Sequence, residues 1–301
     1  MKVIGIDIGG TKILGGLIDE TGNLLEETLV YTEAHLGREK ILENLFIAID
    51  KVIDKNVKGI GIGSAGRINF EEGIVEYATD NLPGWTGCNL KQLLEDKYKI
   101  PAIVDNDVNA AVIGEMWQGA GRGYKDIVMI AIGTGVGGAV VCNGEVIRGK
   151  NWSAGEIGHM VLYPNGRQCN CGQKGCLEQY VSGTAIARTY RELSKEKKIA
   201  GTEEVFLLAE KGDKVALEVV NDFVNSLSIA ILSLKNLLDP EIFIIGGGVI
   251  GAKRIWWDKL KEILKGKANI TPAQLENKAT MVGAAKLMID FLENDWGGRS
   301  L

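Results

Sequence analysis

The sequence predicts an α/β protein made of two related domains with a cleft between them. The first observation is a pattern of strand, glycine turn and strand that occurs twice, over Val3–Ile18 and Ile127–Val141. The second is that each copy is followed by a buried strand that ends in glycines, Gly59–Gly66 in the first half and Glu241–Gly248 in the second. Because the order of patterns is the same in both halves, we expect two domains built on one plan.

Helical patterns separate these strands, at roughly Arg38–Lys55 and Ala216–Leu238. A last helix is expected over about Lys278–Glu293, and its Ala-x-x-x-Gly-Ala-Ala spacing suits close packing. We expect this helix to return to the first domain. The expected domains are a smaller N-terminal α/β domain, residues 1–108 plus about 280–301, and a larger α/β domain with a cysteine-rich loop, residues 109–279.

Composition restricts the partners of the chain. Its 301 residues are 46% hydrophobic and 24% charged, and the net charge is −5 without a long basic run, so nucleic acid is not an expected partner. No apolar run reaches the roughly 20 residues that span a bilayer, and the glycine-rich N-terminus does not resemble a signal peptide. We therefore expect a cytoplasmic protein in a reducing compartment, with no membrane partner.

Three of the five cysteines lie in one short stretch, at Cys169, Cys171 and Cys176. In a reducing compartment, clustered thiols bind a metal more often than they form disulfides. Zinc prefers four ligands in a tetrahedron, and His159 lies ten residues upstream of the first thiol. The only other histidine, His35, lies among charged residues near an expected helix start. These four residues predict a structural Zn²⁺ site without an open coordination position.

Two other interpretations of these cysteines are less favoured. A redox pair is not indicated, because no Cys-x-x-Cys follows a strand–helix unit. Unligated thiols remain an alternative, and the isolated Cys88 and Cys142 are treated as structural.

Glu156 and Glu178 flank the predicted ligands, so the loop that the metal would hold carries carboxylates at both ends.

The glycine loops do not fit the common nucleotide-binding motifs. G-x-G-x-x-G occurs three times, at Gly61–Gly66, Gly133–Gly138 and Gly246–Gly251, which shows how unspecific the pattern is. A dinucleotide site needs a strand before the glycines, a helix after them and an acid about 20 residues later, and none of the three meets all these conditions. No phosphate-binding loop of the G-x-x-x-x-G-K-[ST] type occurs either.

The two hairpin turns are candidates for binding phosphate by another route. Their glycines expose backbone N–H groups beside a threonine hydroxyl, and two such turns facing each other would form a pocket for a polyphosphate. Asp7, just before the first turn, could position Mg²⁺ through water. The alternative is that both turns are only tight hairpins and Asp7 a turn acid. The predicted nucleotide-binding residues are Asp7, Gly9, Gly10, Thr11, Lys12, Gly133, Thr134, Gly135, Gly247 and Gly248.

A second polar cluster, Asp105-Asn106-Asp107-Val108-Asn109, follows a short buried strand. An aspartate at a strand end could accept a proton from a sugar hydroxyl while its neighbours bind the ring. The alternative is an N-cap for the helical stretch Ala110–Trp117, and both roles can hold. Asn81 adds an amide in a turn that also contains Trp85, and as a bare motif it favours turn chemistry.

Four motifs together resemble the ROK family of bacterial sugar kinases and repressors. They are Asp7-x-Gly-Gly-Thr-Lys12, Asn106-Asp-x-Asn109, Gly155-Glu-x-Gly-His159 and Cys169-x-Cys-Gly-x-x-Gly-Cys-x-Glu178, and they span most of the chain. The resemblance implies an actin-like, ribonuclease-H-related two-domain fold with an interdomain cleft. It also implies ATP, Mg²⁺ and a homodimer or homotetramer.

The resemblance further implies the roles of individual residues. Asp107 is the expected general base, and a zinc-held loop is expected to aim Glu178 at the substrate. The residues expected to bind or line the sugar are Gly66, Asn81, Asn106, Asp107, Glu156, His159 and Glu178.

The expected function is ATP-dependent phosphorylation of a hexose, with glucose to glucose 6-phosphate as the first choice. N-acetylmannosamine, N-acetylglucosamine, mannose and fructose stay open as acceptors. A sugar-responsive repressor needs a helix-turn-helix ahead of the first glycine turn, where only six residues precede Asp7. A non-catalytic sugar-binding protein is disfavoured by the intact Asp7 and Asp107.

Overall fold

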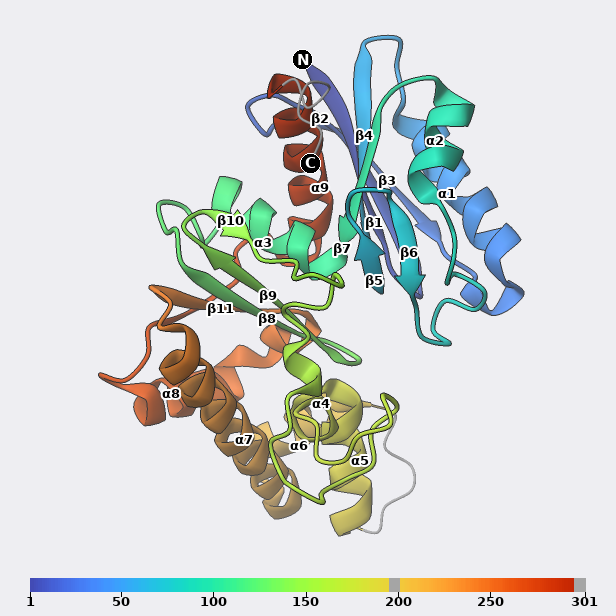
Figure 1. Ribbon diagram of the computed structural model, residues 1–301. Coiled ribbons are helices and arrows are strands. Elements are labelled where there is room, and N and C mark those ends of the chain that lie inside the picture. The colour runs from blue at the N-terminus through green and yellow to red at the C-terminus, as the bar shows by residue number, and fades with distance from the viewer. Residues whose placement is uncertain (195–200, 295–301) are drawn as a thin grey trace. The chain divides into compact units, whose positions relative to one another are not determined.

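The computed structural model describes residues 1–194 and 201–294. The chain divides into two compact units (Figure 1). Unit 1 contains Met1–Gly123, Arg148–Ala154 and the residues from Gln274 onward, of which 295–301 lie outside the described part. Unit 2 contains Tyr124–Ile147 and Gly155–Ala273. The chain therefore passes from one unit to the other four times.

Unit 1 is built on a five-stranded mixed sheet in the order β3-β2-β1-β4-β7. The first three strands form an antiparallel meander, and β4 and β7 run parallel to β1. The strands are β1 (Lys2–Ile8), β2 (Lys12–Asp19), β3 (Leu24–Tyr31), β4 (Val57–Ser64) and β7 (Ala102–Asn106), and a separate hairpin joins β5 (Arg67–Asn69) to β6 (Ile74–Tyr77).

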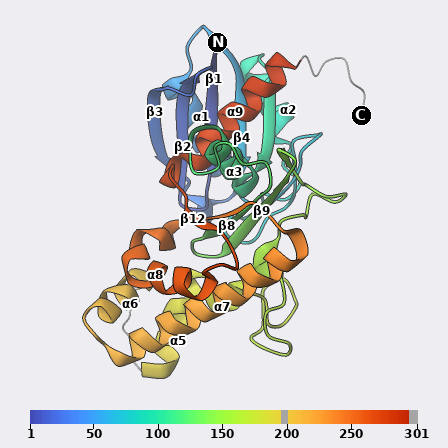
Figure 2. The same cartoon turned by 90° about the vertical axis from the view of Figure 1, so that its left-hand side faces the viewer.

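Helices cover both faces of this sheet (Figures 1 and 2). Helices α1 (Arg38–Val52) and α2 (Leu90–Tyr98) share one apolar core with the sheet, and α3 (Asp107–Gln118) and α9 (Ala279–Glu293) share another on the opposite face. Short 3-10 helices η1 (Ala34–Leu36) and η4 (Glu276–Lys278) precede α1 and α9. Both faces are buried, so the inner strands are almost continuously apolar rather than alternating.

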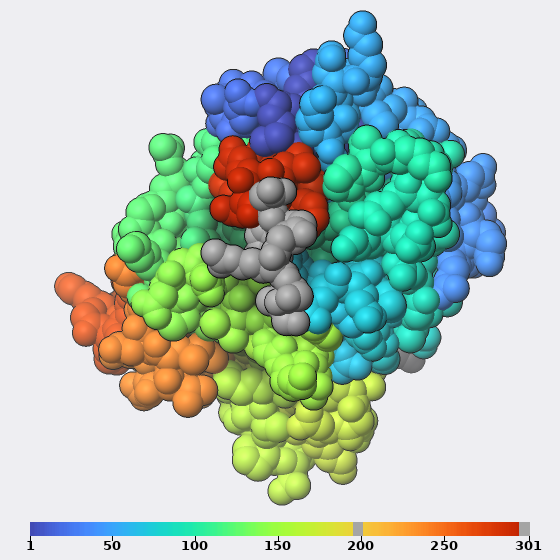
Figure 3. All heavy atoms as spheres, turned by 45° about the horizontal axis from the view of Figure 1, so that its top comes forward, coloured from blue at the N-terminus to red at the C-terminus, as the bar shows by residue number. Residues whose placement is uncertain are grey.

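Glycine allows α9 to lie directly on its neighbours. A Cβ at Gly61 of β4 would overlap the backbone oxygen of Ala284, and a Cβ at Gly283 would overlap that of Ala110 in α3. The small-residue spacing in the last helix therefore serves close packing, as expected. Figure 3 shows one end of α9, in red, next to the blue N-terminal strands of the same unit.

Unit 2 repeats the plan. Its sheet has the order β10-β9-β8-β11-β12, with an antiparallel hairpin of β8 and β9 and with β11 parallel to β8. The strands are β8 (Ile127–Ile132), β9 (Val136–Cys142), β10 (Glu145–Val146), β11 (Ile242–Gly246) and β12 (Ile270–Pro272). The helical segments are η2 (Ile157–His159), α4 (Glu178–Val181), α5 (Gly183–Ser194), α6 (Thr202–Glu210), α7 (Lys214–Leu238), η3 (Gly248–Ala252) and α8 (Lys253–Leu264).

The predicted fold class, an α/β protein with a repeated strand–turn–strand plan, is confirmed. The domain limits at residues 108 and 280 stay a prediction. In the structure, unit 1 extends to Gly123 because α3 packs on α9 and on β4.

Helix α7 is the one described helix that is long and apolar enough to cross a membrane by length and composition. Its most apolar window is 56% buried, and its inward face, including Phe223 and Leu227, forms the core of unit 2 together with Trp256 of α8. This burial is typical of the core helix of a globular domain.

Candidate functional site

The carboxyl ends of three parallel strands in unit 1 carry the predicted acceptor residues. Asn106 ends β7 and caps α3, because its side-chain oxygen accepts hydrogen bonds from the N–H groups of Val108 and Asn109. Its Nδ2 donates to the Gly66 carbonyl and to Asp107 Oδ1, both at 2.9 Å. Three predicted residues, Gly66, Asn106 and Asp107, are thus joined directly, and the capping role expected for this segment is confirmed.

The neighbouring Asp105 is fully engaged elsewhere. It is 1% exposed, and its Oδ2 accepts hydrogen bonds from Nε and Nη2 of Arg148 at 2.9 and 2.6 Å. Its Oδ1 accepts from the Asn109 amide. The Arg148 guanidinium also stacks on the Phe70 ring at 3.7 Å. Asp105 therefore holds residues 148–154 on unit 1, and both of its oxygens already accept hydrogen bonds from within the protein.

Asp7 lies at the end of β1, near enough to Asp107 for the two carboxylates to interact. Burial, with the Asp107 charge as a second cause, raises the pKa of Asp7 to about 7, while the charge of Lys12 opposes the shift. Two carboxyl groups that repel each other in a half-buried place are suited to a shared cation.

The first glycine turn is closed by its own backbone and by the next strand. Gly9 N–H donates to the Lys12 carbonyl, and the Thr32 hydroxyl donates to the Gly9 carbonyl. A Cβ at Gly10 would lie 3.3 Å from the Asn81 carbonyl oxygen, so the turn and the Asn81 loop are in contact.

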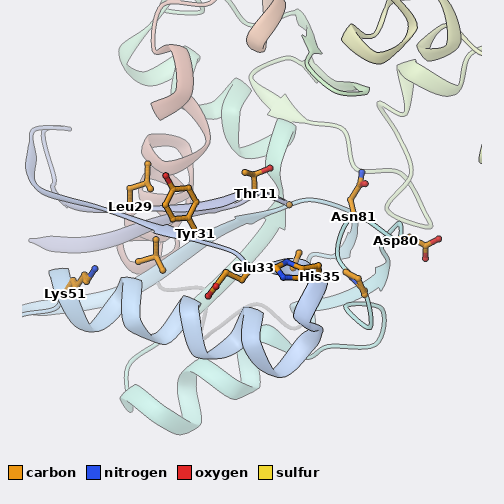
Figure 4. Close-up of a pocket in the computed structure, with 12 residues that line it drawn as sticks. Thr11, Leu29, Tyr31, Glu33, His35, Lys51, Asp80 and Asn81 are labelled. Carbon is orange, nitrogen blue, oxygen red and sulfur yellow. The ribbon is translucent and has the colours of Figure 1, made fainter. Parts of the chain in front are cut away.

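These residues border a pocket of about 800 Å³ within unit 1. Figure 4 shows Thr11 and Asn81 on its wall, together with Tyr31, His35 and Lys51. The wall mixes acids and bases, and His35 reaches it from η1, directly before α1 as expected.

The second glycine turn, in unit 2, is supported by the start of α5. Gly183 N–H donates to the Gly133 carbonyl at 2.8 Å, and the Thr184 hydroxyl donates to the Thr134 carbonyl at the same distance. The N-terminus of a helix offers unpaired N–H groups and a positive dipole end. A tight turn packed on such a helix end is suited to an anionic ligand.

This turn borders a pocket of about 750 Å³ that lies within unit 2. The predicted Gly133, Thr134 and Gly248 line it, while Gly247 packs on the carbonyl of Ile132 behind it. Apolar side chains form part of the wall, including Phe206, Val249 and Ile255. A pocket with a phosphate-type turn beside an apolar wall has the polarity of a nucleotide.

One of the two carboxylates that flank the cysteine loop, Glu178, contacts the end of the same turn. Glu178, the first residue of α4, accepts a hydrogen bond from the Val136 N–H at 2.9 Å. A Cβ at Gly158 of η2 would overlap the Val136 carbonyl, so η2 packs on the same residue. Glu156, directly before η2, keeps an exposed side chain. Glu178 and Gly158 thus both contact Val136 at the start of β9, and Glu156 and His159 lie close to Gly158 in the chain.

The four predicted metal ligands converge. The ligand atoms of His159, Cys169, Cys171 and Cys176 all lie within 4.8 Å of one another. The Cys169 Sγ is 3.6 Å from His159 Nδ1, and the Sγ atoms of Cys171 and Cys176 are 3.6 Å apart. Tetrahedral bonds of about 2.3 Å to sulfur and 2.0 Å to nitrogen place neighbouring ligand atoms roughly 3.6–3.8 Å apart. The ligand set therefore fits zinc, and the sulfur separation is too long for a disulfide.

The other two cysteines differ from each other. Cys88 is buried in the unit 1 core, whereas Cys142 at the end of β9 is exposed, and all five thiols are unpaired by disulfides. A structural role therefore suits Cys88 but finds no support in the surroundings of Cys142.

Sequence reasoning did not identify much of the unit 2 pocket. Its apolar wall comes from α6, η3 and α8, far apart in sequence, and no local pattern distinguishes these residues from core. Gly183 and Thr184 could have been predicted as anion-binding residues, because they begin a helix and helix N-termini bind anions.

Both the sequence and the fold of the chain are similar to those of known proteins. The sequence pattern of the ROK family matches residues 3–291. The chain is 36% identical to a glucokinase from Thermotoga maritima, covering 96% of this chain and 97% of that protein. It superposes on a ROK family glucokinase from Streptomyces griseus, in complex with glucose and AMPPNP, with a TM-score of 0.82, 32% identity and coverage of 95% and 99%.

A third similar protein carries a different assignment. It is a putative N-acetylmannosamine kinase from Listeria monocytogenes, with a TM-score of 0.86, 27% identity and coverage of 98% and 100%. The α/β fold of this chain matches the actin-like sugar-kinase fold of the ROK glucokinase structures. The chain therefore belongs to the ROK family and has the fold of its sugar kinases.

Proposed function

We propose that the protein transfers the γ-phosphoryl group of ATP to the 6-hydroxyl of glucose, with Asp107 as general base. The coarser assignment, an ATP-dependent hexokinase of the ROK type, rests on glucokinase relatives that match nearly the whole chain. The assignment of Asp107 as general base rests on the Asn106–Asp107 pair, because the Asn106 amide fixes the Asp107 carboxylate beside the Gly66 turn.

Asp107 suits the role of base better than Asp105. One oxygen of Asp107 is oriented by Asn106 Nδ2 and by the Val108 N–H, whereas Asp105 is held by Arg148. Phosphoryl transfer depends mainly on positioning and charge neutralisation, with a base to accept the proton of the hydroxyl. Asp107 takes that proton, while Asn106, Asn81, Glu156, His159 and Glu178 hydrogen-bond the sugar hydroxyls.

The nucleotide is assigned to the unit 2 pocket. In this proposal the Gly133–Gly135 turn and the start of α5 hold the phosphates, Phe206 and Ile255 contact the base, and Gly247 and Gly248 close the pocket floor. The Gly9–Lys12 turn of unit 1 is the second turn proposed to bind phosphate. Mg²⁺, when bound, neutralises phosphate charge, and Asp7 is the residue proposed to hold it through water.

The cysteine cluster is proposed to bind one structural zinc ion. Its four ligands leave no open position, so the ion stabilises the loop and takes no part in the reaction. The ligand geometry supports this, as does the placement of Glu178 two residues after Cys176. We further propose a cytoplasmic homodimer or homotetramer, without nucleic-acid or membrane partners.

N-acetylated hexosamines are the second candidate acceptors. The similarity to a putative N-acetylmannosamine kinase favours them. An unmodified hexose is preferred here because a dense set of hydroxyl partners rejects analogues that leave its polar groups unpaired.

The test of the proposed base is Asp107→Asn, which keeps the size of the side chain but cannot accept the proton. We expect kcat to fall by about 10²–10⁴-fold, while calorimetric titration still shows glucose binding. Asp96→Asn, on the exposed surface of α2, is the matched control and should retain full activity. An Asp107→Asn enzyme with nearly unchanged kcat would eliminate Asp107 as the base.

A further inference from the structure

The side chain of Gln179 lies between the cysteine cluster and an arginine of helix α5. Its Nε2 is 3.6 Å from the sulfur of Cys169, and its Oε1 is 3.0 Å from Nη1 of Arg188. Cys169 is buried, and Gln179 is half-buried. The amide therefore bridges a proposed metal ligand and a cation on another helix.

The chemistry of arginine settles which way the amide points. A guanidinium has only donors, so the atom of Gln179 that faces Arg188 must be the carbonyl oxygen. The amide N–H₂ group then faces the Cys169 sulfur. The contact is an N–H···S hydrogen bond, and no other assignment of the amide atoms satisfies both neighbours.

Two arginines fix the position of Gln179 from its backbone as well. Nη2 of Arg188 donates to the Gln179 carbonyl at 2.7 Å, and Nη1 of Arg167 donates to the same oxygen at 3.0 Å. Arg167 in turn donates to the hydroxyl of Thr189 on α5. Three hydrogen bonds from arginines thus hold Gln179 at two oxygen atoms, so its amide is directed at the sulfur before any metal binds.

We propose that Gln179 is a positioning residue for the metal site. Its N–H···S bond orients Cys169 and lowers the charge density on the thiolate, and Arg188 keeps the donor in place. Because Gln179 directly follows Glu178, the same contact couples the metal loop to the carboxylate proposed to bind the sugar. The inference rests on the proposed zinc site and goes beyond it.

The test measures how firmly zinc is held. Zinc transfer from the purified holoprotein to a chromophoric chelator gives the affinity without any assay of activity. Gln179→Leu and the isosteric Gln179→Glu both remove the N–H donor, and we expect each to weaken zinc binding by about 10–100-fold, as loss of such outer contacts typically does.

Gln168→Leu is the matched control. Gln168 lies in the same loop and donates only to the backbone carbonyls of Cys169, Gly172 and Gln173, not to a sulfur. We expect its effect on zinc affinity to be clearly smaller. Equal losses in Gln168→Leu and Gln179→Leu would show general loosening of the loop and overturn the proposal.

Cobalt substitution adds a readout that loop stability alone does not change. Removing a hydrogen bond from a thiolate raises the energy of the sulfur electrons. The sulfur-to-cobalt charge-transfer band should therefore move to longer wavelength in both Gln179 variants but not in Gln168→Leu. If the wild-type protein binds zinc, and zinc affinity and the cobalt band are unchanged in both Gln179 variants, this inference alone is refuted. A wild-type protein that binds no zinc refutes the zinc site and the inference with it.

Discussion

The Glu178 carboxylate accepts a hydrogen bond from the backbone N–H of Val136 at 2.9 Å, directly after the Gly133–Gly135 turn. A residue proposed to bind the sugar therefore also braces the turn proposed to bind the phosphates. A Cβ at Gly135 would lie 2.5 Å from Glu178 Oε2, so only glycine fits between them. Glu178 therefore links the proposed sugar site to the proposed phosphate-binding turn of unit 2.

Glu178→Ala should weaken nucleotide binding even without sugar. Loss of the hydrogen bond frees the turn, at a cost of about 1 kcal/mol, which corresponds to a roughly fivefold higher Kd. The measurement is calorimetric titration with a non-hydrolysable ATP analogue. Glu156→Ala is the control, because Glu156 is exposed and should affect sugar binding only. Equal nucleotide affinity in the two variants would contradict the bracing role.

The activity should depend on pH through Asp7. Its pKa of about 7 means that protons compete with Mg²⁺ near neutrality, so activity falls below pH 7. Raising the Mg²⁺ concentration should move this acidic limb to lower pH, because cation binding favours the ionised carboxylate. Rate profiles from pH 5 to 9 at two Mg²⁺ concentrations measure the shift. If the acidic limb of the rate profile does not shift with Mg²⁺ concentration, a group other than Asp7 causes it.

Ionisation of Asp7 should affect stability in the opposite direction from activity. The folded pKa of Asp7 lies above its ordinary value of 3.8, so its contribution to stability is fully present below about pH 4 and is lost as pH rises through 7. Asp7→Asn should therefore stabilise the metal-free protein at pH 8, on the order of 1–2 kcal/mol after allowance for solvent screening, while reducing activity. Thermal melts at pH 5 and 8 give the comparison, and a variant equally stable to wild type at both would contradict it.

Glu115 should be among the most sensitive positions for stability. It is fully buried, and its carboxylate accepts hydrogen bonds from the N–H groups of Ala120, Gln274 and Leu275 at 2.7–3.1 Å. These donors flank two of the places where the chain leaves and re-enters unit 1. Glu115→Gln turns an amide N–H₂ toward N–H donors, so we expect a loss of about 2–3 kcal/mol.

The thermal midpoint of Glu115→Gln measures this loss. Glu218→Gln, on the exposed side of α7, is the control and should melt like wild type. If the two variants melted together, the buried carboxylate would not be holding the two crossing segments.

The repeated plan was predictable because each hairpin and each buried strand is a local pattern. Val3–Ile18 became β1 and β2, Ile127–Val141 became β8 and β9, and the predicted helix at Ala216–Leu238 became most of α7. No prediction covered β3, an edge strand on which Leu25, Leu29 and Tyr31 are exposed. Its pattern follows from edge position rather than from burial, and sequence alone does not show which strand is an edge.

In the candidate site, too, residues in local patterns were predictable from the sequence, whereas residues that depend on distant partners were not. The cysteine cluster was predictable because ligand type and spacing are local, and Asn106 was predictable as a cap. Arg148 was not, because its partner Asp105 is 43 residues away and nothing near Arg148 indicates a buried ion pair. Gln179 was missed for a similar reason, since its role depends on Arg188 of the next helix.

The central claim, that glucose is the preferred acceptor of phosphoryl groups from ATP, is tested most directly by kcat/KM for a panel of sugars. Glucose, mannose, fructose, N-acetylglucosamine and N-acetylmannosamine are compared under one set of conditions, with each sugar phosphate identified by mass. The account predicts the highest kcat/KM for glucose, with glucose 6-phosphate as product. An acetylated sugar that exceeds glucose tenfold, about 1.4 kcal/mol in the transition state, would contradict it.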